Sequence, residues 1–211
     1  MYGVSASGKT AIYRECLARR ASSVQWLTVE DAFGRLGSAN PPPGVADAWL
    51  PVLLYCHRVL YEGKSAFDDR AVSFVLMHLL RAARIDSAEL PEAVLLDEEV
   101  ALRGMSMGIR HPRGREIART FIELIPAPRV LVYVTNSPDV ILARTRSQKR
   151  HLSMYTNLDD RALAARINLA IDIVSEGVEV LESRGTRVLT LSSEEPRVAN
   201  GKRVDDFLRG A

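Results

Sequence analysis

The chain has 211 residues, of which 47% are hydrophobic and 26% are charged, and its formal net charge is +2. This composition is typical of a single globular α/β domain and excludes a disordered or fibrous chain. The small net charge does not support binding to nucleic acid or to an acidic membrane surface. No apolar run in the sequence approaches the roughly 18 residues that a membrane-spanning helix requires.

Segments with helical and strand patterns alternate along the chain after a glycine-rich turn at its beginning. In chain order, we expect a helix at 8–21, a strand at 24–29, helices at 46–61 and 67–84, a strand at 93–96, an irregular segment at 103–114, a helix at 115–124, a strand at 129–134, helices at 137–146 and 157–184, a strand at 187–191 and a short helix near 204–208. The alternation favours a three-layer α/β fold, with helices on both faces of a mostly parallel central sheet of about five strands. We expect one domain over residues 1–211.

The glycine-rich turn matches the phosphate-binding pattern G-x-x-x-x-G-K-[ST] at every fixed position. Its residues are Gly3, Val4, Ser5, Ala6, Ser7, Gly8, Lys9 and Thr10. The glycines let the backbone turn tightly and approach an anion, and amides of the loop and of the next helix can then bind phosphate oxygens. Lys9 adds a charge for the β- and γ-phosphates, and the Thr10 hydroxyl is a suitable Mg²⁺ ligand. The motif predicts a P-loop NTPase fold that binds ATP and Mg²⁺.

Acidic residues follow two of the expected strands. Asp97 comes after an apolar strand, at the sheet edge where open α/β folds bind ligands, and we predict that it holds Mg²⁺ together with Thr10. Its neighbour Glu98 either polarises water, as in an ATPase, or faces the acceptor, as in a kinase. Glu30 and Asp31 follow an earlier strand, and either carboxylate is a candidate base for a substrate hydroxyl. The sequence leaves the choice between them open.

Basic residues gather after the expected strand at 129–134. Arg144 and Arg146 lie near the end of the following helix, and Arg150 comes four residues after Arg146. Cations of this kind stabilise the negative charge of a phosphoryl group during transfer. We therefore expect a basic lid over about residues 144–156, with these three arginines as catalytic candidates.

The stretch 128–150, PRVLVYVTNSPDVILARTRSQKR, resembles the strand, helix and lid of P-loop small-molecule kinases in the thymidylate kinase and deoxynucleoside kinase group. Arg144 matches the arginine that closes the helix, and Arg146 or Arg150 matches the lid position. The order of phosphate loop, acidic strand end, lid, long helix and last strand is similar over most of the chain. The resemblance implies a nucleoside-monophosphate-kinase-like fold, with MgATP as donor and a small acceptor beneath the lid.

The chain departs from this group after the strand at 93–96. Thymidylate kinases carry Asp-Arg at this point and deoxynucleoside kinases carry Glu-Arg-Ser, whereas this chain has Asp97, Glu98 and Glu99, and its nearest arginine is Arg103. The arginine expected for an acceptor phosphate is therefore not at its usual position. The candidate acceptors remain a nucleoside, a nucleotide, a sugar or another alcohol.

These features predict a cytoplasmic, ATP-dependent phosphotransferase that moves the γ-phosphate of MgATP to a small-molecule acceptor. The alternative is an ATP-hydrolysing or nucleotide-sensing module in which Glu98 polarises water. Cys16 and Cys56 are expected to be buried, reduced thiols of a cytosolic protein. Neither nucleic acid nor a membrane is expected as a partner, and a homodimer is compatible with the sequence, which does not fix the oligomeric state.

Only Met1 and Tyr2 precede the phosphate loop. In this fold the loop follows a central strand that is buried on both faces and should hold about five apolar residues. We therefore expect the first strand to be truncated and the true start of the product to lie upstream of Met1. Without that strand, its two neighbours should be left with unpaired backbone groups.

Overall fold

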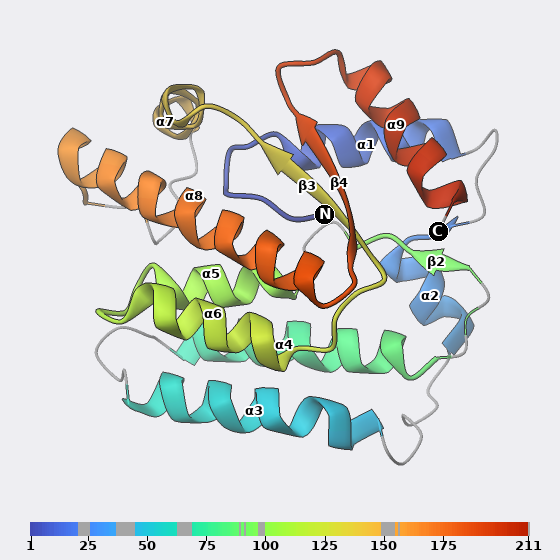
Figure 1. The fold of residues 1–211 in the computed structure, drawn as a ribbon, viewed down its shortest axis with the longest axis horizontal. Helices are drawn as coiled ribbons and strands as arrows, with labels where there is room; N and C mark the ends of the chain where they lie inside the picture. Colours follow the sequence, from blue (N-terminus) through green and yellow to red (C-terminus); the bar gives the residue numbers. More distant parts are fainter. Residues whose placement is uncertain are drawn as a thin grey trace.

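The computed structural model describes residues 1–20, 26–36, 45–62, 69–88, 90, 92–96, 100–148, 155 and 157–210. The helices in this part of the chain are α1 (Lys9–Arg20), α2 (Val29–Leu36), α3 (Val45–Glu62), α4 (Asp69–Asp86), α5 (Ala101–Gly108), α6 (Gly114–Leu124), α7 (Pro138–Ser147), α8 (Asp160–Ser183) and α9 (Arg197–Arg209). The strands are β1 (Trp26–Leu27), β2 (Ala93–Val94), β3 (Val130–Thr135) and β4 (Arg187–Ser192), as Figure 1 shows.

The strands form two parallel pairs. β1 pairs with β2, with Trp26 opposite Ala93, and β3 pairs with β4 along the whole length of both strands. The mixed α/β class and the parallel pairing agree with the expectation from the sequence. A central sheet of about five strands is not confirmed, because the described residues form two separate sheets of two strands each.

The first two residues of the chain lie between these two pairs of strands. Tyr2 forms an isolated parallel bridge with β3: its amide donates to the Val132 carbonyl over 2.8 Å, and the Val134 amide donates to the Tyr2 carbonyl over 2.8 Å. On the other side, the amino group of Met1 donates to the carbonyl of Leu96, two residues after β2. Met1 and Tyr2 therefore occupy the central position at which the truncated first strand was expected.

Helices cover both sides of these strands. α1 and α9 pack together on one side of β3 and β4, and α8 lies on the other side with α5 and α6 beyond it (Figure 1). Met1 and Tyr2 are both buried but belong to different hydrophobic clusters: Met1 packs with residues of α1, α9, β3 and β4, and Tyr2 packs with residues of α8 and its neighbours. Consecutive residues thus point to opposite faces, as they do in a strand that is buried on both sides.

A further layer is formed by α3 and α4. α3 packs against both α4 and α6, on the far side of α5 and α6 from the strands (Figure 1). The indole N–H of Trp49, near the start of α3, donates to the Asp86 carboxylate at the end of α4 over 3.2 Å. This contact between the beginning of one helix and the end of the next shows that the two helices run antiparallel.

The segment around α2 differs from the expectation, which was a strand at 24–29 and no helix before 46. The described strand covers only Trp26–Leu27, and the chain is helical from Val29 onward. The Asp31 amide donates to Oγ1 of Thr28, and the Asp31 carboxylate accepts from the Thr28 amide, both over 3.1 Å. This reciprocal arrangement is a capping box, which stabilises the start of a helix. The Thr-x-x-Asp pattern in the sequence is the local signal for this helix start.

α5 covers the first half of the segment at 103–114 that was expected to be irregular, so that expectation is wrong up to Gly108 and holds for the turns at 109–113. Met105 and Met107 are buried, and Gly108 lies so close to α6 that an added Cβ would be 2.5 Å from the Gly114 carbonyl oxygen. The glycine lowers the intrinsic helix propensity, but it permits this close contact between helices, and the packing outweighs the propensity. The last helix is also longer than expected, since α9 begins at Arg197.

The cysteines are buried, as expected. Cys16 and Cys56 are both free thiols, and burial raises the pKa of each to about 12. At neutral pH both therefore remain protonated and act as small apolar core residues. Over the described ranges, no helix is long and apolar enough to cross a bilayer.

Replacing Gly177 in α8 by alanine is expected to destabilise the protein, because the added Cβ would lie 2.5 Å from the hydroxyl oxygen of buried Tyr2. The Tyr2 ring has little room to move, since its backbone is bonded to β3. We expect the free energy of unfolding, measured by urea denaturation, to fall by about 1–3 kcal/mol.

The matched control is Gly34→Ala in α2, where an added Cβ would meet no atom within 4 Å. This change should raise the free energy of unfolding by up to about 1 kcal/mol, because alanine has the higher helix propensity. If both substitutions had the same effect, the proposed collision with Tyr2 would be refuted.

Candidate functional site

The loop at residues 3–10 has the backbone conformation of a tight anion-binding turn. Gly3, Ala6 and Gly8 have positive φ angles of 143°, 65° and 104°. An added Cβ on Gly3 would lie 2.2 Å from the Val134 carbonyl oxygen, so only glycine fits this position. α1 begins at Lys9, directly after the turn, and the positive N-terminal end of the helix dipole therefore lies at the loop.

Lys9 is the side chain of the loop that is suited to an anionic ligand. Its Nζ donates to the carbonyl oxygens of Gly3 and Val4, each over 2.8 Å, so the ammonium group lies across the loop. Ser7 is completely buried, so its hydroxyl does not face a ligand in this conformation. The turn and the Lys9 ammonium group together fit the phosphates of a nucleotide.

The predicted magnesium ligands are only partly within the described residues. Thr10 is exposed in the first turn of α1, whereas Asp97, Glu98 and Arg150 lie outside the residues that the structure describes. In the described part of the chain, no group of three or more His, Cys, Asp or Glu side chains could hold a metal. A Mg²⁺ ion at Thr10 would take phosphate oxygens and water among its ligands, as Mg²⁺ usually does in nucleotide sites.

Arg144 approaches the phosphate loop from α7. Its Nη1 lies 3.5 Å from the Ala6 carbonyl oxygen, 3.4 Å from the Ser7 carbonyl oxygen and 2.7 Å from Oγ of Ser193. α7 begins where the sequence predicts, with the Ser137 hydroxyl accepting from the Val140 amide as an N-cap. This helix carries Arg144 from a distant part of the sequence to the loop.

Arg146 does not reach the phosphate loop. It extends to the start of α8, where its Nη2 lies 2.9 Å from the Asp160 carboxylate. Both side chains of this ion pair are largely exposed, so it contributes little to stability. Of the three predicted arginines, the structure thus brings Arg144 to the loop and places Arg146 on the surface, while Arg150 is not described.

A cavity of about 550 Å³ lies beside α1, along Tyr13 and Leu17. It is bounded by α1, the junction of β1 and α2, α4 and the segment that follows β2, and its lining residues are Tyr13, Leu17, Thr28, Val29, Glu30, Phe74, Met77, His78, Arg81, Ala82, Leu96 and Val100. Because β1 and β2 are parallel, their carboxyl ends meet at this cavity, the place where open α/β folds bind ligands. The size is suitable for one small molecule.

The two candidate carboxylates have different surroundings. The pKa of Asp31 is lowered by hydrogen bonds from the hydroxyl and then the amide of Thr28, and by Arg20, which forms an ion pair with the same oxygen. A carboxylate with a lowered pKa is a weaker base, and this one is already engaged in the helix cap. Glu30 lines the cavity instead. The geometry favours Glu30 over Asp31 as the carboxylate that faces an acceptor.

α4 contributes site residues that the sequence analysis did not identify. Phe74, His78 and Arg81 all line the cavity, and the rings of Phe74 and His78 meet edge to face with their centroids 4.5 Å apart. The guanidinium of buried Arg103 lies 4.6 Å from the centroid of the Phe74 ring. The available sequence signal was a helix with apolar and basic residues on its solvent side, which is too common to indicate a site without tertiary structure.

No protein-family profile and no curated protein matches this sequence. Comparison with solved structures does find a similar one: a deoxyadenosine kinase from M. mycoides, determined with the products dCMP and a flexible dCDP bound. The TM-score is 0.58 and the sequence identity is 10%, over 100% of this chain and 97% of that chain. The chain has the fold of a deoxynucleoside kinase. The resemblance to the thymidylate kinase and deoxynucleoside kinase group is thus confirmed at the level of the fold.

Replacing Asp31 by asparagine is expected to lower the melting temperature at neutral pH, because the ion pair with Arg20 requires the ionised carboxylate. The folded-state pKa of Asp31 is lowered from 3.8, so its stabilisation is complete above about pH 4 and is lost as the pH falls through the folded pKa. Melting temperatures of both proteins from pH 7 to pH 3 should differ most at pH 7 and converge toward pH 3. A difference that stayed constant would show that the charge of Asp31 does not contribute.

Proposed function

We propose that this protein is a cytoplasmic, ATP-dependent phosphotransferase that moves the γ-phosphate of MgATP to a hydroxyl group of a nucleoside-like acceptor. The observation that carries the proposal is that one helix links two sites: α1 begins at the phosphate loop, and its residues Tyr13 and Leu17 line a cavity that also holds Glu30, in a chain with the fold of a deoxynucleoside kinase. Phosphoryl transfer needs these two neighbouring sites, one for the donor phosphates and one for the acceptor.

The residues have distinct roles in this proposal. The amides of residues 3–10 and the Lys9 ammonium group bind the donor phosphates. Thr10 and Asp97 hold Mg²⁺, which neutralises and orients the phosphates when it is bound. Arg144 adds positive charge beside the loop, and Arg146 and Arg150 belong to the lid over residues 144–156. Glu30 orients the acceptor hydroxyl and accepts its proton.

The cavity lining supports a nucleoside-like acceptor over a sugar or a simple alcohol. Phe74 offers an aromatic face for stacking, and its contacts with His78 and Arg103 hold the ring in place. Glu30 and Arg81 add polar groups at the same cavity, as expected for a ligand with a planar base and a polar sugar. The bound dCMP and dCDP of the similar deoxyadenosine kinase agree with this class of acceptor.

The proposal is tested by comparing Glu30→Gln with Asp31→Asn, two neighbouring carboxylates that lose their charge in the same way. With MgATP and a panel of deoxynucleosides, nucleoside monophosphates, sugars and other alcohols, mass spectrometry should identify a phosphorylated product. Glu30→Gln should lower kcat by about 10²–10⁴-fold, while Asp31→Asn should keep activity within about threefold, since its role is the helix cap. Lys9→Ala serves as the inactive reference.

Two results would contradict this assignment. Equal losses in both variants would remove Glu30 from its proposed role. ATP consumption that needs no acceptor and is lost in Glu98→Gln would instead establish the rival function, an ATP-hydrolysing or nucleotide-sensing module.

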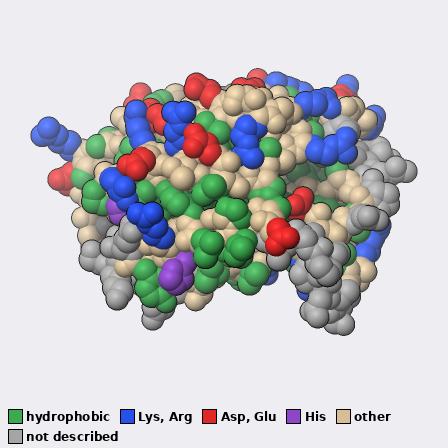
Figure 2. Space-filling view, turned by 60° about the horizontal axis from the view of Figure 1, so that its bottom comes forward, with side chains coloured by type: hydrophobic (Ala, Val, Ile, Leu, Met, Phe, Trp, Pro, Cys, Tyr) green, Lys and Arg blue, Asp and Glu red, His purple; other side chains and the backbone are tan. Residues whose placement is uncertain are grey.

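We also propose that the partner of this protein is a second copy of itself, packed on α3. Leu50, Leu54 and Tyr61 of α3 are 49%, 62% and 57% exposed, and they recur along one face of a helix whose opposite side is buried. Leu80 of α4 is another 62% exposed hydrophobic residue. Figure 2 shows hydrophobic side chains gathered on the face that comes forward from the bottom of Figure 1. A helix that is apolar on both sides is normally covered by another surface.

The charges on this face are arranged for self-association. Asp47 and Arg58 are exposed on the same face of α3 as Leu54, toward opposite ends of the helix. When two copies of α3 pack antiparallel about a two-fold axis, Asp47 of each copy comes opposite Arg58 of the other, and Leu54 comes opposite Pro51. A surface that is complementary to itself is what a symmetric dimer requires.

Leu54→Glu is expected to convert a dimer into a monomer, because it places a charge in the middle of the proposed contact. Analytical ultracentrifugation of the wild type at micromolar concentration should show the dimer. Val198→Glu is the matched control, since Val198 is 60% exposed on α9, far from α3 in the fold. A wild type that stays monomeric at these concentrations would refute the dimer, and loss of the dimer in the Val198 variant as well would refute its location.

A further inference from the structure

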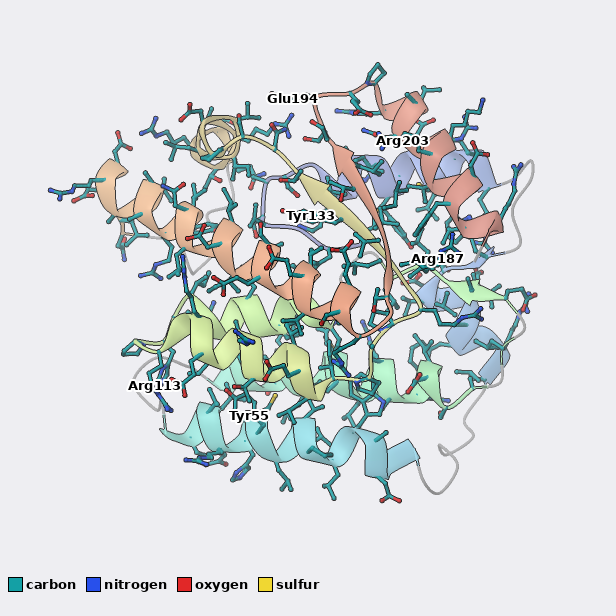
Figure 3. The ribbon with its side chains drawn as sticks, viewed as in Figure 1. Tyr55, Arg113, Tyr133, Arg187, Glu194 and Arg203 are labelled. Carbon is teal, nitrogen blue, oxygen red and sulfur yellow. The ribbon has the colours of Figure 1, made fainter. Side chains whose placement is uncertain are left out.

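The turn after β4 contains a serine that connects Arg144 to the body of the protein. Ser193 directly follows β4, next to Glu194, which is labelled in Figure 3. Its hydroxyl oxygen accepts hydrogen bonds from Nη1 of Arg144 and from Nδ2 of Asn136, each over 2.7 Å. We propose that Ser193 is a positioning residue that holds Arg144 against the phosphate loop and so sets the affinity for the donor nucleotide. The inference rests on the proposed function of the loop and deepens it.

Ser193 is itself held in place by its surroundings. Its amide donates to the Thr135 carbonyl over 3.3 Å, which continues the pairing of β4 with β3. The preceding carbonyl, of Ser192, accepts from Nδ2 of the fully buried Asn200 over 2.7 Å. Asn136 is 8% exposed and is oriented by the Ser137 amide, which donates to its Oδ1 over 2.8 Å. The hydroxyl that receives Arg144 is thus preorganised before any ligand binds.

The same turn packs directly on the phosphate loop. An added Cβ on Gly8 would lie 2.5 Å from Cβ of Ser193, 2.9 Å from its Oγ and 3.5 Å from Nη1 of Arg144. That Nη1 also faces the carbonyl oxygens of Ala6 and Ser7 at 3.5 and 3.4 Å. Arg144 therefore bridges the rigid turn and the outward-facing carbonyls of the loop, and so favours the loop conformation in which the amides are free for phosphate.

The described groups that hold Arg144 are neutral, so they do not cancel its positive charge. Within the described residues, Arg144 forms no ion pair, whereas Arg146 on the same helix is paired with Asp160. An arginine held by a hydroxyl and by carbonyls keeps its positive charge beside the loop. Its contacts with described residues all involve Nη1, which carries two of the five N–H donors of the guanidinium group. Without Ser193, this long side chain would have to be ordered when the nucleotide binds, which weakens binding.

The test measures the dissociation constant for MgATP by isothermal titration calorimetry in a double-mutant cycle. Ser193→Ala should weaken binding by about tenfold, the effect of one hydrogen bond to a charged group, and Arg144→Ala should weaken it by at least as much. In the Arg144→Ala background, the Ser193→Ala change should alter the dissociation constant by less than about twofold, because both substitutions remove the same interaction. A purely structural defect would not disappear in that background.

Ser183→Ala is the matched control, since the Ser183 hydroxyl bonds only to the Val180 carbonyl at the exposed end of α8 in the described structure. It should bind MgATP like the wild type, and the melting temperature of every variant should confirm that it is folded. The inference is overturned if Ser193→Ala binds MgATP as tightly as the wild type, or if its effect is undiminished in the Arg144→Ala background. A wild type that binds no MgATP would overturn the proposed function and, with it, this inference.

Discussion

The pairing of Tyr2 with β3 determines where the phosphate loop lies. Two backbone hydrogen bonds hold Tyr2 on β3, and Gly3 follows immediately, packed against the Val134 carbonyl. The opposite edge of β3 pairs with β4, whose end brings Ser193 against Gly8. A single strand therefore positions both the beginning and the end of the loop. Such a rigid support suits a site that must hold phosphate groups in a defined geometry.

Arg144 differs from arginines on the surface in how it is held. Its described contacts are with a hydroxyl and with carbonyl oxygens, which are neutral. Surface arginines such as Arg115 and Arg203 instead form ion pairs with carboxylates on neighbouring elements. Neutral anchors fix the position of a cation without cancelling its charge, and the charge of Arg144 therefore remains available for an anionic ligand.

The helix cap at the start of α2 determines which carboxylate faces the cavity. Glu30 and Asp31 are neighbours in the first turn of α2, but successive helical residues point about 100° apart. The capping box turns Asp31 toward Thr28 and Arg20, and Glu30 is consequently directed to the cavity. The local cap decides which of two similar carboxylates faces the cavity, whose other lining residues come largely from α1 and α4.

The sequence by itself determined the features that depend on neighbouring residues. The phosphate loop is one of these, because its pattern is complete within 3–10, and so is the cap of α7, where Ser137 accepts from the amide three residues later. The β-branched strands β3 and β4 and the parallel α/β class also followed from local patterns. Asp97, Glu98 and Arg150 remain predictions, since they lie outside the described residues.

Only the tertiary structure decided the contacts between distant segments. Residues 101–108 are helical because their glycines allow α6 to pack closely against them. Met1 and Tyr2 lie between the two pairs of strands. The tertiary structure brought Arg144 and Ser193 to a loop more than 130 residues earlier in the chain, and it lined the cavity with Phe74 and Arg81. The physical reason is that burial and close packing depend on which surfaces meet in the folded chain, and no local pattern of residues records that choice.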